Sequence, residues 1–281
     1  MCEFCLRHGE GEKWYLRAQN YADDLLSDVR RRRFVADFLS DPEGLRRDRD
    51  RLALLARAPG FVRRAVSWGV TRRMKKIHFG QVVPIEDVER IFSFVNSIVR
   101  VPCVCRLVNR GHERRYCYGL SLSPGGGELF RISESLDRTY LAGPDAGELE
   151  SLTREEALRA LREHEAEGLC HSVWTFVTPF IGAICNCDRS DCLAMIATVT
   201  HDVRVMFRAE YVAEVVPERC VGCRQCMRFC QFGALSYSAG TGKAVVDLRD
   251  CFGCGVCRAG CPTGALGLRD RSAVPAAARL W

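Results

Sequence analysis

Two runs of four cysteines near the end of the chain have the spacing of iron–sulfur ligands. The first, Cys220-x2-Cys223-x2-Cys226-x3-Cys230, recurs 31 residues later as Cys251-x2-Cys254-x2-Cys257-x3-Cys261, with Pro262 after the second copy. In runs of this spacing, the fourth cysteine of each run ligates the other cluster. We therefore predict two [4Fe–4S] clusters with crossed ligand sets: Cys220, Cys223, Cys226 and Cys261 for one, and Cys251, Cys254, Cys257 and Cys230 for the other.

The residues between these cysteines repeat as well. Gly222 recurs as Gly253, and the Gly-Ala-Leu triplet at 233–235 recurs at 264–266. Glycine permits turns that bulky residues resist, and backbone N–H groups in such turns can point at sulfur. The alternative is a pair of zinc knuckles built from C-x2-C units. Two complete four-cysteine sets exceed what a zinc ribbon uses, so iron–sulfur clusters are the better interpretation.

These motifs resemble those of a bacterial-type 2[4Fe–4S] ferredoxin domain, over residues of about 208–270. The resemblance implies a small α+β domain that transfers single electrons. Segments 211–216 and 244–248 are predicted strands, and 238–243 is the predicted hairpin turn. Gln231 departs from the family, which usually has proline after the first run. The departure puts the local turn in question, but no ligand.

Seven further cysteines occur in the middle of the chain, and six of them form two separated groups. Neither group has ordinary spacing for a complete four-ligand site, but together they supply enough thiols for one. We predict a third metal centre assembled from both groups, and the C-x-C pairs leave an iron–sulfur cluster and zinc both open. The alternative is that several of these thiols are small buried apolar side chains. The six are Cys103, Cys105, Cys117, Cys185, Cys187 and Cys192; Cys170 is predicted to be a core residue.

Several short motifs also resemble a group of poorly characterised multi-cluster ferredoxin-like proteins of anaerobic microbes. They are Pro-Cys-Val-Cys-Arg at 102–106, Gly-Leu-Cys-His at 168–171, Ile-Cys-Asn-Cys at 184–187 and the opening around Cys2, Cys5 and His8. This resemblance extends over most of the chain and implies that the middle cysteines bind a cluster. It implies no substrate. Cys2, Cys5 and His8 alone form an incomplete metal site that needs a fourth ligand.

The elements that deliver the middle cysteines are predicted from their patterns. Pro84 opens an amphipathic helix that continues to Val99 and leads to the first cysteine pair. Thr153 and Glu156 form a capping box for a second helix, which ends at Gly168. An apolar, strand-like run at 171–180 then leads to the second pair. The two halves therefore share one plan, a helix followed by a C-x-C pair.

The positive charge is concentrated in the first 80 residues, which hold 18 Lys and Arg against 11 Asp and Glu. Arg30 to Arg33 follow an amphipathic stretch from Trp14 to Val29, and six Lys and Arg residues between 63 and 76 flank the apolar residues of 61–68. Residues 41–44 are predicted to separate two helices. Such basic helices suit an acidic redox partner, nucleic acid or an anionic membrane surface; the alternative is a solvated helix face. We favour a redox partner protein with an acidic surface, and we do not expect nucleic-acid binding.

Composition sets the class of protein. The chain has 281 residues, 47% hydrophobic and 27% charged, with 17 cysteines and a net charge of +6. These values predict a folded protein of two or three domains. No apolar run is long enough for a membrane span, and the start lacks a secretory pattern, so we expect a cytoplasmic protein. The predicted fold is α+β: a basic helical region at 1–80, a mixed α/β middle domain at 81–205 and a small ferredoxin domain at 206–281.

Two functions follow from these predictions. The first is an iron–sulfur electron-transfer protein that relays single electrons through the two C-terminal clusters, with a third centre extending the path. The second is an oxidoreductase whose middle cysteine centre is catalytic and receives electrons from the ferredoxin domain. The sequence has no dinucleotide fingerprint, nucleophile elbow or zinc-protease motif. We therefore expect an electron carrier or an oxidoreductase subunit.

Overall fold

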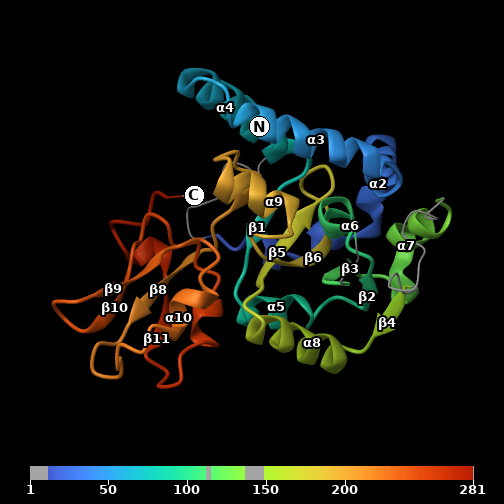
Figure 1. Ribbon diagram of the computed structural model, residues 1–281. Coiled ribbons are helices and arrows are strands. Elements are labelled where there is room, and N and C mark those ends of the chain that lie inside the picture. The colour runs from blue at the N-terminus through green and yellow to red at the C-terminus, as the bar shows by residue number, and fades with distance from the viewer. Residues whose placement is uncertain (1–11, 112–114, 137–148, 281) are drawn as a thin grey trace.

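The computed structural model describes residues 12–111, 115–136 and 149–280 (Figure 1). Cys2, Cys5 and His8 lie outside these ranges. The centre of the fold is a seven-stranded sheet with the order β4-β2-β3-β6-β5-β1-β7, in which β1 and β7 are parallel and the other pairs antiparallel. The strands are β1 (Gly80–Val82), β2 (Ser97–Val101), β3 (Cys117–Ser121), β4 (Glu150–Leu152), β5 (Cys170–Thr175), β6 (Ile181–Cys187) and β7 (Met206–Phe207).

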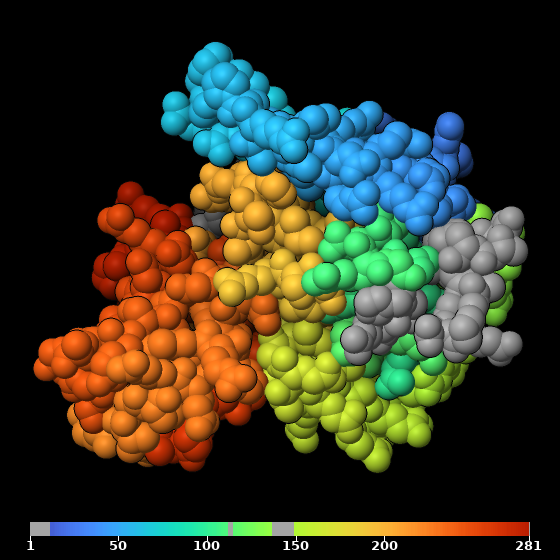
Figure 2. All heavy atoms as spheres, in the orientation of Figure 1, coloured from blue at the N-terminus to red at the C-terminus, as the bar shows by residue number. Residues whose placement is uncertain are grey.

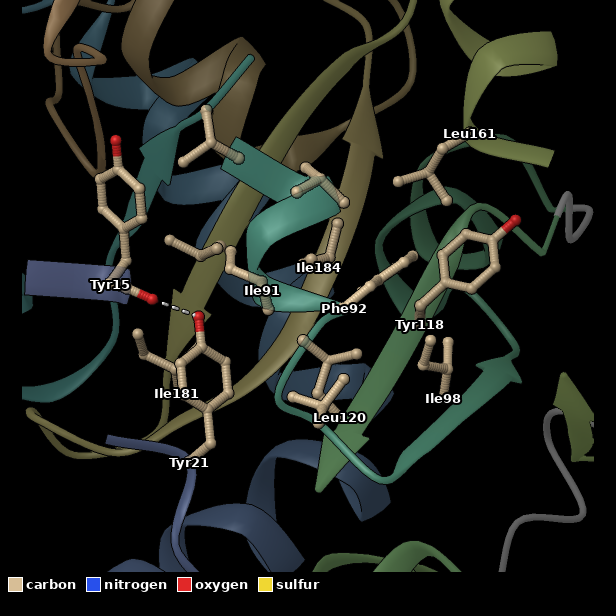
Figure 3. Packing of buried hydrophobic residues seen from close by; sticks show 14 of the residues in the cluster. Tyr15, Tyr21, Ile91, Phe92, Ile98, Tyr118, Leu120, Leu161, Ile181 and Ile184 are labelled. Carbon is tan, nitrogen blue, oxygen red and sulfur yellow. Dashed lines mark hydrogen bonds between the residues drawn. The ribbon is translucent and has the colours of Figure 1, made fainter. Parts of the chain in front are cut away.

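One face of this sheet carries the main hydrophobic core. Side chains alternate between the two faces of a strand, so Ile98 of β2 and Ile184 of β6 point to the same side. They pack with Ile91 of helix α5 (Ile85–Ile91) and Leu161 of helix α8 (Arg154–Ala166) (Figure 3). The predicted capping box of α8 is confirmed, with Thr153 accepting from the Glu156 N–H. Helices α5 and α8 therefore cover the face opposite to the cysteines.

The helix predicted from Pro84 to Val99 is shorter than expected. It ends at Ile91, and Val99 belongs to strand β2. Apolar residues at 95, 98 and 99 fit either a helical or a strand period over so short a run, and pairing with β3 decides the outcome. The strand-like run predicted at 171–180 is instead β5 followed by a turn into β6, with Val177 at φ 56°.

The other sheet face is covered by short helices and by the three long helices of the N-terminal region, α2 (Val29–Ser40), α3 (Pro42–Leu55) and α4 (Gly60–Ile77). The short helices are α6 (Val104–Arg110), η4 (Pro124–Gly126), α7 (Gly127–Glu134), α9 (Leu193–Met195) and the π-turn η6 (Ile196–Thr200). Before α2, the N-terminal region has three 3-10 helices, η1 (Trp14–Leu16), η2 (Ala18–Tyr21) and η3 (Asp23–Ser27). The stretch predicted to be an amphipathic helix from Trp14 is thus a series of 3-10 turns. Its Trp14, Tyr15 and Tyr21 are buried in the main core.

The C-terminal segment forms a lobe beside the sheet (Figure 2). It contains two two-stranded sheets, β9 with β10 and β8 with β11, so the predicted strands and hairpin are confirmed. The elements are β8 (Tyr211–Val215), α10 (Gln225–Phe229), β9 (Leu235–Ser238), β10 (Lys243–Val246), η7 (Val256–Arg258), β11 (Leu266–Asp270) and η8 (Arg271–Ala273). Among the described residues, no helix has the length and apolar character needed to cross a membrane. The fold class is α+β, as predicted.

Candidate iron–sulfur and metal centres

The two halves of the C-terminal segment are related by an internal twofold repeat that includes hydrogen bonds to sulfur. Two backbone N–H groups donate across the repeat, from each half to a cysteine of the other half. Two more donate to the fourth cysteine of their own run. The four bonds are Ala244 N to Cys220 Sγ (3.4 Å), Ala213 N to Cys251 Sγ (3.3 Å), Ala234 N to Cys230 Sγ (3.2 Å) and Ala265 N to Cys261 Sγ (3.2 Å). N–H donors on sulfur are what a bound iron–sulfur cluster requires.

The glycines at the centre of each cysteine loop are required by close packing as well as by backbone conformation. Gly222 and Gly253 have φ of 68° and 70°, a region that favours glycine. A Cβ at Gly222 would clash with the carbonyl oxygen of Gly242, and one at Gly253 would clash with that of Tyr211. Positions 242 and 211 are themselves 31 residues apart, so the repeat preserves the contact as well as the residue type.

The first predicted ligand set comes together around one pocket. Its lining includes Cys220, Cys223, Cys226 and Cys261, the four cysteines that the crossed assignment groups together. Burial, followed by repulsion from the thiolates of the other three, raises the pKa of the Cys226 thiol. A cysteine must lose its proton to bind metal, so cluster binding here releases protons. The pocket and the crossed pattern fit a cluster held by these four residues.

The second set is grouped in the same way but is buried more deeply. Burial, with repulsion from the thiolates of Cys251 and Cys230, raises the pKa of Cys254 to about 12. Burial also raises the pKa of Cys257, and repulsion from the thiolates of the other three members of the set adds to this rise. Cys230 thus lies with the second run rather than with its own. The donor set is four thiols in an apolar surrounding, which fits a [4Fe–4S] group.

Four of the middle-domain cysteines lie on one face of the central sheet because of its register. Cys117 of β3 is paired with Cys185 of β6, and Cys187 of β6 is paired with Cys170 of β5. Positions 185 and 187 are two residues apart and therefore point to the same side, and cross-strand partners share that side. Three adjacent strands thus present a row of sulfur atoms on the face away from the main core.

The remaining middle cysteines are brought onto this row by the helices above it. Cys103 is the N-cap of α6 and Cys105 lies in its first turn, while Cys192 is the N-cap of α9. Cys185 Sγ lies 3.4 Å from Cys117 Sγ, and Cys192 Sγ lies 3.3 Å from Cys187 Sγ. Cys103 interacts with Cys117, and Cys105 with Cys192. The structure therefore brings together all six cysteines in which we predicted a third centre.

Two further residues belong to this group and were missed from the sequence. Cys170, predicted to be a core residue, interacts electrostatically with Cys192 and with Cys254 of the ferredoxin segment. Its position opposite Cys187 becomes evident only once the strand register is known. The second is Arg106, whose buried guanidinium donates to the Asn186 carbonyl (3.1 Å) and to the Asp188 carboxylate.

Arg106 places a fixed positive charge beside the middle thiols. It stacks on the Tyr116 ring at 4.3 Å. Burial opposes its charge, but the thiolates of Cys103 and Cys187, with Asp188, more than offset that effect and raise the pKa of Arg106. A permanent cation lowers the cost of gathering thiolates in a buried place. Its signal in the sequence was its position directly after Cys105.

Gln231, where the ferredoxin family usually has proline, joins the ferredoxin segment to the middle domain. Its Nε2 donates to the Gly168 carbonyl (2.7 Å), and its Oε1 accepts from the Arg189 N–H (3.1 Å). Gly168 precedes β5 and Arg189 follows β6, so both partners flank strands that carry middle cysteines. The same residue is next to Cys230. The departure from the family therefore forms a contact between the two predicted sites.

No three or more His, Cys, Asp or Glu side chains in the described ranges are arranged to hold a single metal ion. This applies to the eight ferredoxin cysteines and to the middle group alike. None of the cysteines within those ranges forms a disulfide. The chemistry that both groups offer is thiolate ligation in buried, partly apolar surroundings, with N–H donors or Arg106 to balance the negative charge.

Comparison with known proteins confirms the ferredoxin resemblance for the C-terminal segment. Residues 203–265 match the family of 4Fe–4S dicluster domains. The archaeal-type glutamate synthases [NADPH] of Thermotoga sp. (strain RQ2) and Thermotoga maritima are each 35% identical to this chain over 60 residues. The match spans 21% of this chain and 12% of each relative. No solved structure matches the chain.

Proposed function

We propose that the chain is an iron–sulfur electron-transfer protein that relays single electrons through two C-terminal [4Fe–4S] clusters, with a third metal centre in the middle domain. Clusters with this ligation gain and lose one electron and need no substrate pocket. The observation that carries the proposal is the twofold set of N–H···S hydrogen bonds around two crossed groups of four cysteines. The match to dicluster domains supports the same conclusion.

The side chains have distinct tasks in this proposal. The eight cysteines of the two runs, Cys220 to Cys230 and Cys251 to Cys261, hold the clusters, and the N–H groups of Ala213, Ala234, Ala244 and Ala265 stabilise charge on sulfur. Cys170 bridges the two parts of the molecule, because it interacts both with Cys254 and with Cys192. A reducing cytoplasm, in which thiols stay free, is the compartment that suits this chemistry.

The third centre would be held by members of the middle group. Support comes from the mutual contacts of Cys103, Cys105, Cys117, Cys185, Cys187 and Cys192 on one sheet face and from the buried charge of Arg106. Such a group is more than a hydrophobic core needs, since buried thiols that serve only packing are not gathered around a buried cation. Thiolates are ligands of both iron–sulfur clusters and zinc, but a single zinc ion would require these side chains to move from the arrangement described above.

The first test is the metal content of protein purified without oxygen. About twelve irons with matching sulfide would support three clusters, since each four-thiolate cluster holds about four irons. About eight irons with about one zinc would support a zinc site in the middle domain. About eight irons alone would keep the two-cluster function and reject the third centre. Fewer than about eight would contradict the presence of two [4Fe–4S] clusters in the ferredoxin segment.

Serine substitutions assign the metal to each group. Cys223→Ser and Cys254→Ser are matched because they occupy equivalent positions of the repeat. Each is expected to lose iron and to unfold the ferredoxin segment, whose small core depends on its clusters. Cys185→Ser is expected to lose only the middle metal. Full iron content and unchanged thermal stability in both ferredoxin variants would contradict the proposal.

A catalytic middle centre is the second candidate, and one observation favours it. With Cys170, seven thiols lie on or above the same sheet face, more than the four that one cluster uses. Spare thiols beside a metal centre are compatible with a substrate-binding position. Addition of a substrate should then change the electron paramagnetic resonance signal that Cys185→Ser abolishes and leave the two ferredoxin signals unchanged.

A further inference from the structure

The two cysteine loops of the ferredoxin segment have the same backbone but different surroundings. Arg224 and Gly255 occupy equivalent positions of the repeat, and their φ angles are 66° and 79°. The exposure of the loops differs. Cys254 is 9% exposed and Val256 is fully buried, whereas the equivalent Cys223 and Gln225 are both exposed. The two loops therefore share one backbone conformation, but only the second is covered by other parts of the chain.

The second loop is buried because the middle domain packs on its outer face. Val256 and Cys254 belong to one apolar cluster with Trp174 of β5, and Phe252 packs against the same cluster. Arg258, at the end of the loop, donates to both carboxylate oxygens of Glu86 in α5, at 2.5 and 2.9 Å. This face of a cysteine loop thus serves as a protein-binding surface within the molecule itself.

The first loop presents the equivalent face to solvent, with an apolar centre and a basic rim. Val221 is 68% exposed and takes the position of Phe252 in the repeat. Arg219, Arg224 and Arg228 are exposed around it. Within the part of the chain that the structure describes, no carboxylate lies within ion-pair distance of these three arginines. Glu218 is the acidic residue of this stretch.

Arg224 also has a backbone conformation that costs energy for any residue with a side chain. A left-handed conformation is unfavourable for an L-residue, and the equivalent position has glycine. The guanidinium carbon lies 3.9 Å from the centre of the Tyr237 ring, which holds the charge at the surface of the loop. An arginine kept in a strained conformation, where glycine would serve the fold, points to a use for its charge.

We propose that the first cysteine loop, residues 219–228, is the docking surface for an acidic redox protein. The partner would place an apolar patch over Val221 and carboxylates against the surrounding arginines. This inference rests on the proposed function and deepens it, since it assigns one end of the electron path to an external protein and the other to the middle domain. An apolar centre with a charged rim is the usual anatomy of a transient interface.

The test measures binding of a flavodoxin with an acidic surface to the anaerobic full-length protein, by calorimetry at low and high salt. Arg219→Glu combined with Arg228→Glu is expected to raise Kd about tenfold and to remove most of its salt dependence. The matched control is Arg64→Glu with Arg73→Glu, which reverses two exposed charges on the basic helix α4. This control is expected to change Kd by less than about twofold.

A third variant separates docking from folding. Arg224→Gly relieves the strained conformation while removing one charge, so it should leave iron content unchanged and still weaken binding. Equal effects of the loop and α4 variants, a larger effect of the α4 variant, or no flavodoxin binding at low salt would overturn the proposal. A wild-type dimer that the loop variant dissociates would identify a second copy of the chain as the occupant instead. Iron content and reduction by dithionite, measured on every sample, report separately on the proposed function.

Discussion

At the scale of single residues, Gln231 is the clearest case of a family position put to a different use. Proline at this position would remove both hydrogen bonds that the side chain makes to Gly168 and Arg189. The equivalent residue in the second copy, Pro262, is exposed. Gln231 is therefore the member of this pair of positions that contacts the middle domain, and its amide contributes to the orientation of the ferredoxin segment.

Gln231→Pro should weaken the contact between the two parts without removing a cluster. Loss of these two hydrogen bonds lowers the free energy of unfolding by about 1–3 kcal/mol in total. We expect unchanged iron content and a corresponding decrease in the free energy of unfolding of the holoprotein. Gln225→Ala, at an exposed glutamine of α10, is the control and should have no measurable effect. Loss of iron in Gln231→Pro would show that the turn, rather than the contact, requires glutamine.

At the scale of elements, the strand register explains why part of the site was predictable and part was not. The eight proposed ferredoxin ligands can be predicted from spacing alone, because all eight lie within two local loops. The grouping of Cys103 with Cys185 does not follow from spacing, because it depends on pairing between distant strands. Cys170 is a buried core residue, as predicted, but its place beside the middle cysteines depends on its pairing with Cys187. The helix expected to reach Val99 fails for the same reason, since strand pairing overrides a short apolar pattern.

The junction between α4 and β1 depends on a histidine that burial keeps neutral. His78 lies among the rings of Phe38, Trp174 and Phe176, with Nδ1 2.5 Å from the Thr175 carbonyl. Burial lowers its pKa from 6.5 to about 4. As the pH falls below 6.5, the unfolded chain binds a proton that the folded chain does not. The stability that this site contributes is therefore present above pH 6.5 and is lost toward pH 4.

Comparison of the wild type with His78→Phe isolates this effect. The variant loses the hydrogen bond to Thr175 at every pH but has no group to titrate. Between pH 6.5 and 5, the wild type should lose about 1.5 kcal/mol more stability than the variant does. Chemical unfolding at the two pH values measures the difference, and acid damage to clusters is common to both proteins. A difference in stability between the two proteins that does not change with pH would contradict a neutral, half-buried His78.

At the scale of the whole molecule, one buried polar network joins all three regions. Trp14 donates to Gln81 of β1 (2.5 Å), and Gln81 donates to Glu210 (3.4 Å). Glu210 accepts from Arg271 (2.5 Å), and both side chains are about 1% exposed. Arg271 also donates to carbonyl groups at 277, 278 and 280. The N-terminal region, the sheet and the C-terminal tail are therefore connected through a single ion pair.

Glu210→Gln should destabilise the whole protein, because it leaves the Arg271 charge buried without its partner. Breaking a buried ion pair in this way costs about 3–5 kcal/mol. Glu214→Gln, which removes the exposed pair with Arg269 (3.4 Å), is the matched control and should cost less than about 1 kcal/mol. Urea unfolding measures the loss, and hydrogen exchange at 274–280 should increase only in Glu210→Gln. Equal costs in the two variants would show that the network does not join the regions.

The unequal cover of the two cysteine loops also determines where damage by air would begin. Dioxygen approaching from solvent meets the exposed Cys223 before it meets Cys254, which lies beneath the middle domain. Oxidation of a thiolate follows its accessibility. Exposure to air would thus damage the first loop, which is the proposed docking surface, before the second loop, which packs on the middle domain. Damage of this kind would end electron exchange with a partner protein before it reaches the interior of the molecule.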